Sequence, residues 1–108
     1  MTILSSRSAR AGLTLFALAA LAALAAPLPP AQAADPAAGR KKAMQCQTCH
    51  GLDGIAQIPI APHLAGESQI YLETQLKAFR NGKREHEMMT VVAKDLSDAD
   101  ISDLAAWY

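Results

Sequence analysis

Two cysteines and a histidine stand close together in the run Cys46-Gln47-Thr48-Cys49-His50. This is the C-x-x-C-H arrangement through which a haem is attached covalently. Two thiols separated by two residues can reach one edge of a porphyrin and add to its two vinyl groups, which leaves two thioether bonds. The adjacent imidazole can then bind the iron as its proximal ligand. The motif therefore predicts one haem c, attached at Cys46 and Cys49, with His50 on the iron.

Other chemistry is open to the same cysteines. A disulfide between them suits an exported chain, and a thioredoxin-like redox pair uses the same spacing. No βαβ pattern surrounds the motif, however, and neither alternative gives His50 a role. A structural zinc site normally needs four ligands, and His63 and His86 lie at no recognised ligand spacing from the cysteines. Haem attachment is the interpretation that uses all three residues of the motif.

The N-terminal segment has the order of features of a secretory signal peptide. Residues 1–33 contain two arginines near the start, no acidic residue and an apolar run over residues 11–26. That run is shorter than the ~20 residues of a membrane-spanning helix, and prolines follow it. The small residues of a cleavage site come next, so we expect cleavage before Ala34 and export to the periplasm. A retained membrane anchor is the alternative, although no basic stop-transfer cluster follows directly.

The remaining residues, 34–108, are predicted to form one domain. At about 75 residues, a hydrophobic core alone is marginal, and a staple or cofactor is usually needed. Eight basic and ten acidic residues leave this part a formal charge of −2, which gives no electrostatic footprint for nucleic-acid binding. Basic residues gather at 40–42 and 77–84. Such patches could steer a protein partner, although they are also typical of solvated faces.

Three main helices are expected, and the sequence has no alternating strand pattern. Asp35 can cap a helix from about Pro36 to Gln47. Ser68 can cap a second helix, which ends at Asn81-Gly82, and Ser97 can cap a last helix that reaches the C-terminus. Glycines and prolines make residues 51–66 a long loop, which in so small a domain indicates that something other than protein fills the middle. The domain is predicted to be all-α around a cofactor.

A second iron ligand is expected on the haem face opposite His50. The chain after processing offers Met44, Met88 and Met89, and a thioether ligand raises the potential as electron transfer requires. Met44 lies too close to the cysteines to reach that face. Met88 and Met89 lie in a polar segment, residues 83–95, that we expect to be flexible enough to reach it. These residues alone leave the choice open, and His86 in the same segment is a rival.

Taken together, residues 34–108 resemble a class I cytochrome c, of the small bacterial periplasmic kind that also occurs as the halves of dihaem periplasmic cytochromes. The resemblance implies a small class I cytochrome c fold, with about three main helices wrapped around one covalently attached haem. It rests on these runs: Cys46 to Gly51 with Asp53-Gly54, Pro62 to Gly66, Tyr71 to Leu76 with Phe79, Leu96 to Ile101, and Leu104 to Tyr108.

The same resemblance implies the distal ligand. In this family the distal methionine precedes the Leu-Ser start of the last helix by a spacing that falls on Met89. Met88 is the runner-up and is otherwise expected to pack in the core or on the surface. The spacing does not match His86.

Further roles follow from the resemblance. The family's proline after the haem motif, here Pro62, would offer its carbonyl oxygen to the second ring nitrogen of His50. His63 would lie on the proximal side as a solvated loop histidine rather than as an iron ligand. Gly39 would lie where the first and last helices cross, against one of the two aromatic residues that end the chain.

A haem with both axial positions filled has no open site for a substrate, but its edge can pass single electrons to a docked protein. The resemblance therefore implies a periplasmic single-electron carrier rather than an enzyme, with redox proteins as donor and acceptor and no stable membrane insertion after processing. A second hypothesis makes the chain the haem subunit of a periplasmic dehydrogenase or oxidase complex, with catalysis on another polypeptide. A third, a haem sensor or peroxidase with a displaceable methionine, is disfavoured by the small size.

Overall fold

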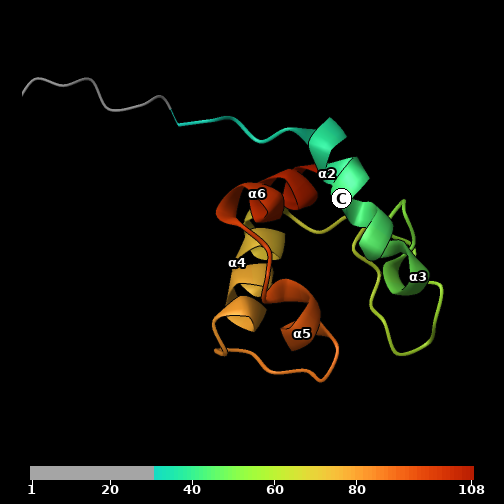
Figure 1. Cartoon of the computed structure of the whole chain (residues 1–108). Helices are drawn as coiled ribbons and strands as arrows, with labels where there is room; N and C mark the ends of the chain where they lie inside the picture. Colours follow the sequence, from blue (N-terminus) through green and yellow to red (C-terminus); the bar gives the residue numbers. More distant parts are fainter. Residues whose placement is uncertain (1–30) are drawn as a thin grey trace, which may run out of the picture. The chain divides into compact units, whose positions relative to one another are not determined.

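The computed structural model describes residues 31–108. Helices are the only regular secondary structure in this part of the chain. The predicted signal peptide lies almost wholly outside these residues. Residues Ala33–Tyr108 form one unit, and the prediction of an all-α domain is confirmed. No helix of this unit is long and apolar enough to cross a membrane. The elements in Figure 1 are α2 (Pro36–Lys42), the 3₁₀ helix η2 (Ala43–Gln45), α3 (Gln47–His50), α4 (Gln69–Arg80), α5 (Met89–Ala93) and α6 (Asp98–Trp107).

The three main helices, α2, α4 and α6, begin where their capping residues predict. The carboxylate of Asp35 accepts two backbone N–H groups of the first turn of α2, at 2.8 and 3.3 Å. The hydroxyl of Ser68 accepts the N–H of Tyr71 in α4 at 3.2 Å. Ser97 and Asp100 form a reciprocal capping box at the start of α6. These side chains satisfy backbone donors that a helix start otherwise leaves without partners.

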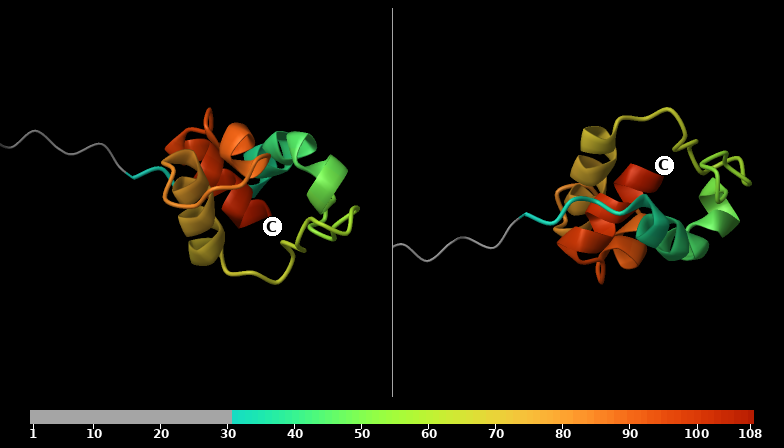
Figure 2. Two further views of the ribbon diagram at one scale, coloured as in Figure 1. Left: turned by 90° about the horizontal axis from the view of Figure 1, so that it is seen from below. Right: turned by 90° about the horizontal axis from the view of Figure 1, so that it is seen from above.

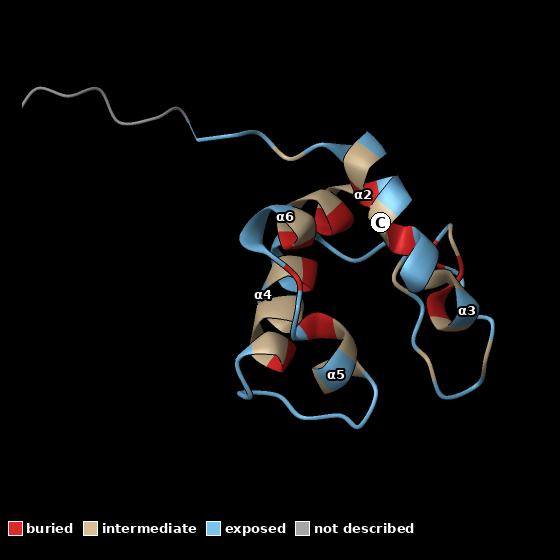
Figure 3. Ribbon diagram, in the orientation of Figure 1, coloured by how far each residue is buried: buried red, intermediate tan, exposed pale blue. Residues whose placement is uncertain are grey.

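The core lies between the main helices, since α6 packs against both α2 and α4. Figure 3 shows buried residues on each of these three helices, and Ile101 and Leu104 of α6 are almost completely buried. We call the central group of buried residues the core cluster. Its members are Ala43, Phe79, Ala93, Leu96, Ile101 and Leu104.

The first helix does not continue to Gln47 as predicted. It ends at Lys42, tightens into the 3₁₀ helix η2, and a separate turn, α3, follows Cys46. Such 3₁₀ segments are frequent at helix ends. This one places Ala43, which is fully buried, in the core cluster. Because a 3₁₀ turn holds fewer residues than an α turn, it also rotates the residues after it relative to the face of α2.

The segment 83–95, predicted to be flexible, contains the short helix α5. This helix packs against α4, and its Ala93 is fully buried. Burial of that small side chain in the core cluster explains why the segment is held as a helix despite its polar flanks. The long loop is confirmed: Figure 2 shows residues 51–68 running from α3 to α4 without a helix of their own.

Candidate haem site

One helical turn carries the three residues of the C-x-x-C-H motif. The N–H groups of Cys49 and His50 both donate to the carbonyl oxygen of Cys46, at 3.3 and 3.0 Å. Positions i, i+3 and i+4 of such a turn share one face, so both thiols and the imidazole face the same side. Gly51 ends the turn with φ +74° and has no room for a side chain, because a Cβ atom there would collide with the carbonyl oxygen of Ile55. Both cysteines are free thiols and are partly buried.

His50 is held by a hydrogen bond to the following loop. The residue is 8% exposed, and it is the only buried polar residue among the described residues. Its Nδ1 lies 2.9 Å from the carbonyl oxygen of Pro62. A carbonyl oxygen only accepts, so Nδ1 carries the hydrogen and the lone pair of Nε2 remains available for a metal. The bond predicted between Pro62 and His50 is therefore present in the structure.

Backbone contacts hold the loop that carries Pro62. Gly54, with φ +81°, lies so close to Ala65 that a Cβ atom would stand 2.6 Å from the Ala65 nitrogen. Its carbonyl oxygen accepts the N–H of Leu64 at 2.8 Å. The N–H of Ala56 donates to Nδ1 of His63 at 2.8 Å, across the same loop. His63 is exposed, as predicted, and in addition joins two parts of the loop.

The two C-terminal aromatic residues anchor the start of this loop to α6. Trp107 donates its indole N–H to the carbonyl oxygen of Leu52 at 2.8 Å, and Tyr108 donates its hydroxyl to that of Gly51 at 3.1 Å. Figure 2 shows the C-terminus beside the segment that leaves α3. Sequence reasoning missed these bonds, since it assigned the two aromatic residues only to helix packing. The only signal was their polar N–H and O–H, which seek partners when partly buried.

Burial perturbs two ionisable groups beside the motif. It raises the pKa of Cys46, and the nearby Cys49 raises it further. Burial also raises the pKa of Tyr108 to about 12, with smaller effects from the thiolate of Cys46 and the carboxylate of Asp53. Both side chains are therefore neutral at pH 7 before the haem is attached.

The structure separates the two candidate methionines. Met89 is the first residue of α5 and packs, partly buried, against the core cluster. Cys46 packs against the same cluster. Met88 precedes the helix and is 56% exposed. In Figure 1, α3 and α5 both lie below α6 but come from different parts of the chain. Met89, unlike Met88, thus packs against the same core cluster as Cys46 of the motif.

The residues present fit a haem in two respects. His50 offers a lone pair from a nitrogen whose ring is already oriented, which is the arrangement of a metal-binding histidine. Several large apolar side chains are also exposed. Ile60, Ile70 and Val91 are 77%, 80% and 69% exposed, and the broad apolar faces of a porphyrin are the kind of surface that would cover such side chains.

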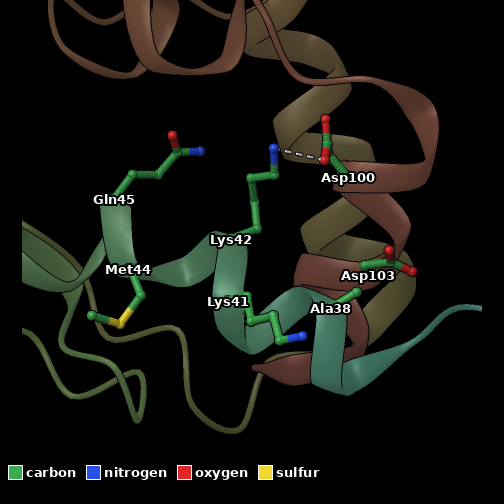
Figure 4. Close-up of a pocket in the computed structure, with 7 residues that line it drawn as sticks. All are labelled: Ala38, Lys41, Lys42, Met44, Gln45, Asp100 and Asp103. Carbon is green, nitrogen blue, oxygen red and sulfur yellow. Dashed lines mark ion pairs between the residues drawn. The ribbon is translucent and has the colours of Figure 1, made fainter.

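A separate hollow of about 430 Å³ lies between α2, η2 and α6 (Figure 4). An ion pair spans it, with Nζ of Lys42 2.9 Å from the Asp100 carboxylate. The hydrogen bond from Lys42, followed by that from the Ser97 backbone, lowers the pKa of Asp100 to about 2. None of the predicted site residues lines this hollow, so it is not the haem site. Its lining residues are Ala38, Lys41, Lys42, Met44, Gln45, Asp100 and Asp103.

Comparison with known proteins identifies the family. The family described as cytochrome c oxidase, cbb3-type, subunit III matches residues 31–107. Cytochrome c-554(548) of Halomonas halodenitrificans is 48% identical over 79 residues, which are 70% of this chain and 95% of that protein. Cytochrome c4 of Pseudomonas aeruginosa is 43% identical over 76 residues, 70% of this chain and 38% of that protein.

A further relative bears a functional name. The thiosulfate dehydrogenase electron acceptor of Thiomonas intermedia is 40% identical over 74 residues, 67% of this chain and 34% of that protein. The chain thus spans little more than a third of this relative and of the cytochrome c4, but almost all of cytochrome c-554(548). With a matching family model over most of its length and these relatives, the chain belongs to the cytochrome c family, as an all-α class I domain with one covalent haem c that transfers electrons and is not itself an enzyme.

Proposed function

We propose that this domain is a single-electron carrier in which Cys46 and Cys49 hold the haem through thioether bonds. His50 is the proximal iron ligand in this proposal and Met89 the distal one. The haem iron, when bound, supplies the chemistry by cycling between its ferric and ferrous states. The protein's part is to hold both ligands in place and to keep water and substrates off the iron.

The hydrogen bond from His50 Nδ1–H to the Pro62 carbonyl oxygen is the observation that carries this proposal. It fixes the tautomer and the ring orientation of His50 and raises the basicity of Nε2. His50 lies on the same helical turn as the two free thiols of Cys46 and Cys49. A structural histidine has no need for this combination, whereas a histidine that binds the iron of an attached haem needs all of it.

We further propose that residues 1–33 are a signal peptide cleaved before Ala34, and that the domain works in the periplasm. Support comes from the order of basic, apolar and small residues in this segment. Mass spectrometry of the protein isolated from the periplasmic fraction tests both statements. A first residue other than Ala34 moves the cleavage point, and a mass that includes residues 1–33 contradicts cleavage.

A second candidate is a haem subunit of a periplasmic dehydrogenase or oxidase complex. The name of the Thiomonas intermedia relative and the subunit III family description favour it. A pull-down of the haem-loaded protein from periplasm, followed by stopped-flow reduction with the proteins recovered, separates the candidates. A stable catalytic partner at fixed stoichiometry supports the subunit. Fast electron exchange without a stable complex supports the carrier.

The basic residues predicted to steer partners are largely engaged within the chain. Arg80 donates to Asp98 at 2.6 Å, and Lys77 lies 3.5 Å from Glu73. Arg84 lies over the ring of Phe79 and donates to a glutamine of α4. The carboxylates of Glu73 and Asp98 thus offset two of the positive charges of this patch, whereas the partners of Arg84 are uncharged. The attraction of this surface for a distant partner is correspondingly weaker than the count of basic residues predicts.

Replacement of the two methionines one at a time tests the distal ligand. We expect Met89→Leu to abolish the sulfur-to-iron absorption band of the ferric protein and to lower its reduction potential, because leucine fills a similar volume but offers no lone pair. Met88→Leu is the matched control and should keep both the band and the potential. Loss of the band in Met88→Leu alone would transfer the ligand to Met88. A band in both variants would exclude both methionines.

A further inference from the structure

His86 contacts the backbone of the helix that carries Met89. Its Nδ1 lies 3.3 Å from the backbone nitrogen of Met88 and 3.4 Å from that of Met89. The backbone N–H of His86 donates to the hydroxyl of Thr90 at 2.9 Å, and the backbone N–H of Thr90 donates back to the His86 carbonyl oxygen at 2.9 Å. His86 is thus bonded, through side chain and backbone, to three successive residues at the start of α5.

This arrangement is that of a helix cap. Side-chain acceptors that cap helices bond the N–H groups two and three residues ahead. Asp35 does so at the start of α2, with Ala37 at 2.8 Å and Ala38 at 3.3 Å. His86 has the same spacing to its two donors at slightly longer distances. His86 stands further from its helix than Asp35 does, so its imidazole nitrogen bonds the N–H groups of Met88, directly before α5, and of Met89, the first residue of α5.

The short helix α5 needs such a cap. It has five residues, no acidic residue in its first turn and no side-chain bond from Met88, which stands directly before it. A helix of this length is not stable by itself. Burial of Ala93 secures its C-terminal end against α4. The end that carries Met89 is secured, in the described part of the chain, by the bonds of His86 and Thr90.

The same bonds determine what His86 offers to a metal. Backbone N–H groups are donors, so Nδ1 must supply its lone pair to them and the ring hydrogen of the neutral imidazole lies on Nε2. Neither nitrogen then has a lone pair left for iron. In this arrangement His86 is not the sixth ligand, although the sequence alone left it as a rival of the methionines.

We propose that His86 is a positioning residue for Met89: by capping α5 at the backbone of Met88 and Met89, its imidazole holds the distal ligand toward the iron. This proposal rests on the proposed function, in which Met89 is the distal ligand. Without the cap the first turn of α5 can unwind, and the thioether of Met89 has more conformations in which it is detached. His86 therefore shifts the equilibrium between bound and detached methionine toward the bound state.

Competition with added imidazole measures this equilibrium in the haem-loaded ferric protein. Imidazole binds the iron only when Met89 is detached, so its apparent affinity rises with the detached fraction. We expect His86→Ala to raise the apparent imidazole affinity about fivefold, the shift that corresponds to a typical lost helix cap. His86→Asn, whose side-chain oxygen can accept the same two N–H groups, should return the affinity to that of the parent protein.

Two further variants make the outcome decisive. Glu87→Gln changes an exposed neighbour of His86 and should leave the imidazole affinity unchanged. Thr90→Val removes the hydroxyl that accepts the backbone N–H of His86, and it should raise the imidazole affinity as His86→Ala does. This second variant tests the proposal even if His86→Ala does not fold with its haem. Equal affinities in the parent protein and in His86→Ala would overturn the proposal. Equal increases in His86→Ala and His86→Asn would overturn it as well.

Failure of the proposed function gives a different result. If Met89→Leu keeps the sulfur-to-iron band, Met89 is not the ligand, and the role of His86 falls with it. If Met89→Leu loses the band while His86→Ala leaves the imidazole affinity unchanged, Met89 is the ligand and only the positioning role is wrong. If His86→Ala instead loses the low-spin spectrum and Met89→Leu does not, His86 is the ligand.

Discussion

Gly39 of α2 lies directly against the backbone carbonyl group of Asp103 in α6. A Cβ atom on Gly39 would overlap the oxygen and carbon of that carbonyl and would stand 3.0 Å from the Cβ atom of Trp107. The two helices can therefore cross at this distance only because residue 39 has no side chain. Asp103 adds a second tie, since its carboxylate accepts the N–H of Asp35 at 2.7 Å. The predicted role of Gly39 at the crossing is confirmed, with Trp107 as the aromatic neighbour.

Gly39→Ala is expected to destabilise the domain by about 3 kcal/mol, at the upper end of the range for overpacking. The clash is with backbone, which cannot rotate away, so the helices must separate. Alanine gains up to about 1 kcal/mol in helix propensity, which is too little to offset the clash. Chemical denaturation of the haem-loaded protein measures the change. Lys41→Ala, at an exposed site of the same helix, is the control and should change stability by less than about 0.5 kcal/mol. A stability gain in Gly39→Ala would contradict the close crossing.

The double variant Cys46→Ala with Cys49→Ala should lose its haem to acidified organic solvent, whereas the parent protein should keep it. Each single variant keeps one thioether bond and should retain the haem, because one covalent link is enough to resist extraction. Intact-protein mass spectrometry after extraction reports the result. Met44→Leu, next to the motif, is the control and should retain the haem. Haem that stays on the double variant would contradict attachment at these two residues.

Tyr108→Phe is expected to cost about 1 kcal/mol at pH 7, because the Gly51 carbonyl oxygen loses its donor. The pKa of Tyr108 is raised from 10.0 to about 12, so the folded state favours the neutral phenol. The stability that this provides is present below pH ~10 and is lost as pH rises toward 12. Denaturant unfolding at several pH values measures it. The difference between the parent protein and Tyr108→Phe should be constant below pH ~10 and shrink above it.

Tyr71→Phe serves as the control for this measurement. Tyr71 is 45% exposed, and its hydroxyl has no hydrogen-bond partner within the described residues. Removal of that hydroxyl should leave stability and its pH dependence unchanged. A difference for Tyr108→Phe that grows above pH 10 would mean that the phenol is stabilised in its charged form, contrary to its burial.

Features set by neighbours in the chain are the ones that could be predicted. The starts of α2, α4 and α6 follow from Asp35, Ser68 and Ser97, because a cap depends on bonds to residues two or three positions away. The segment around α5 was predicted wrongly for the opposite reason. Its helix depends on tertiary packing against the preceding helix α4, which the residue types of the segment do not encode, and its cap is a histidine, which capping preferences do not favour.

The sequence by itself determined the C-x-x-C-H turn and the all-α class, because both depend on short spacings and on which residue types begin and end helices. Only the tertiary structure decided that Met89 packs inward while Met88 is exposed, and that Trp107 and Tyr108 anchor the loop after the motif. It also showed that the lone pair of His86 is given to backbone amides. The physical reason is that adjacent residues of the same type, such as Met88 and Met89, have the same local preferences. They differ only in their contacts with parts of the chain that folding brings close to them.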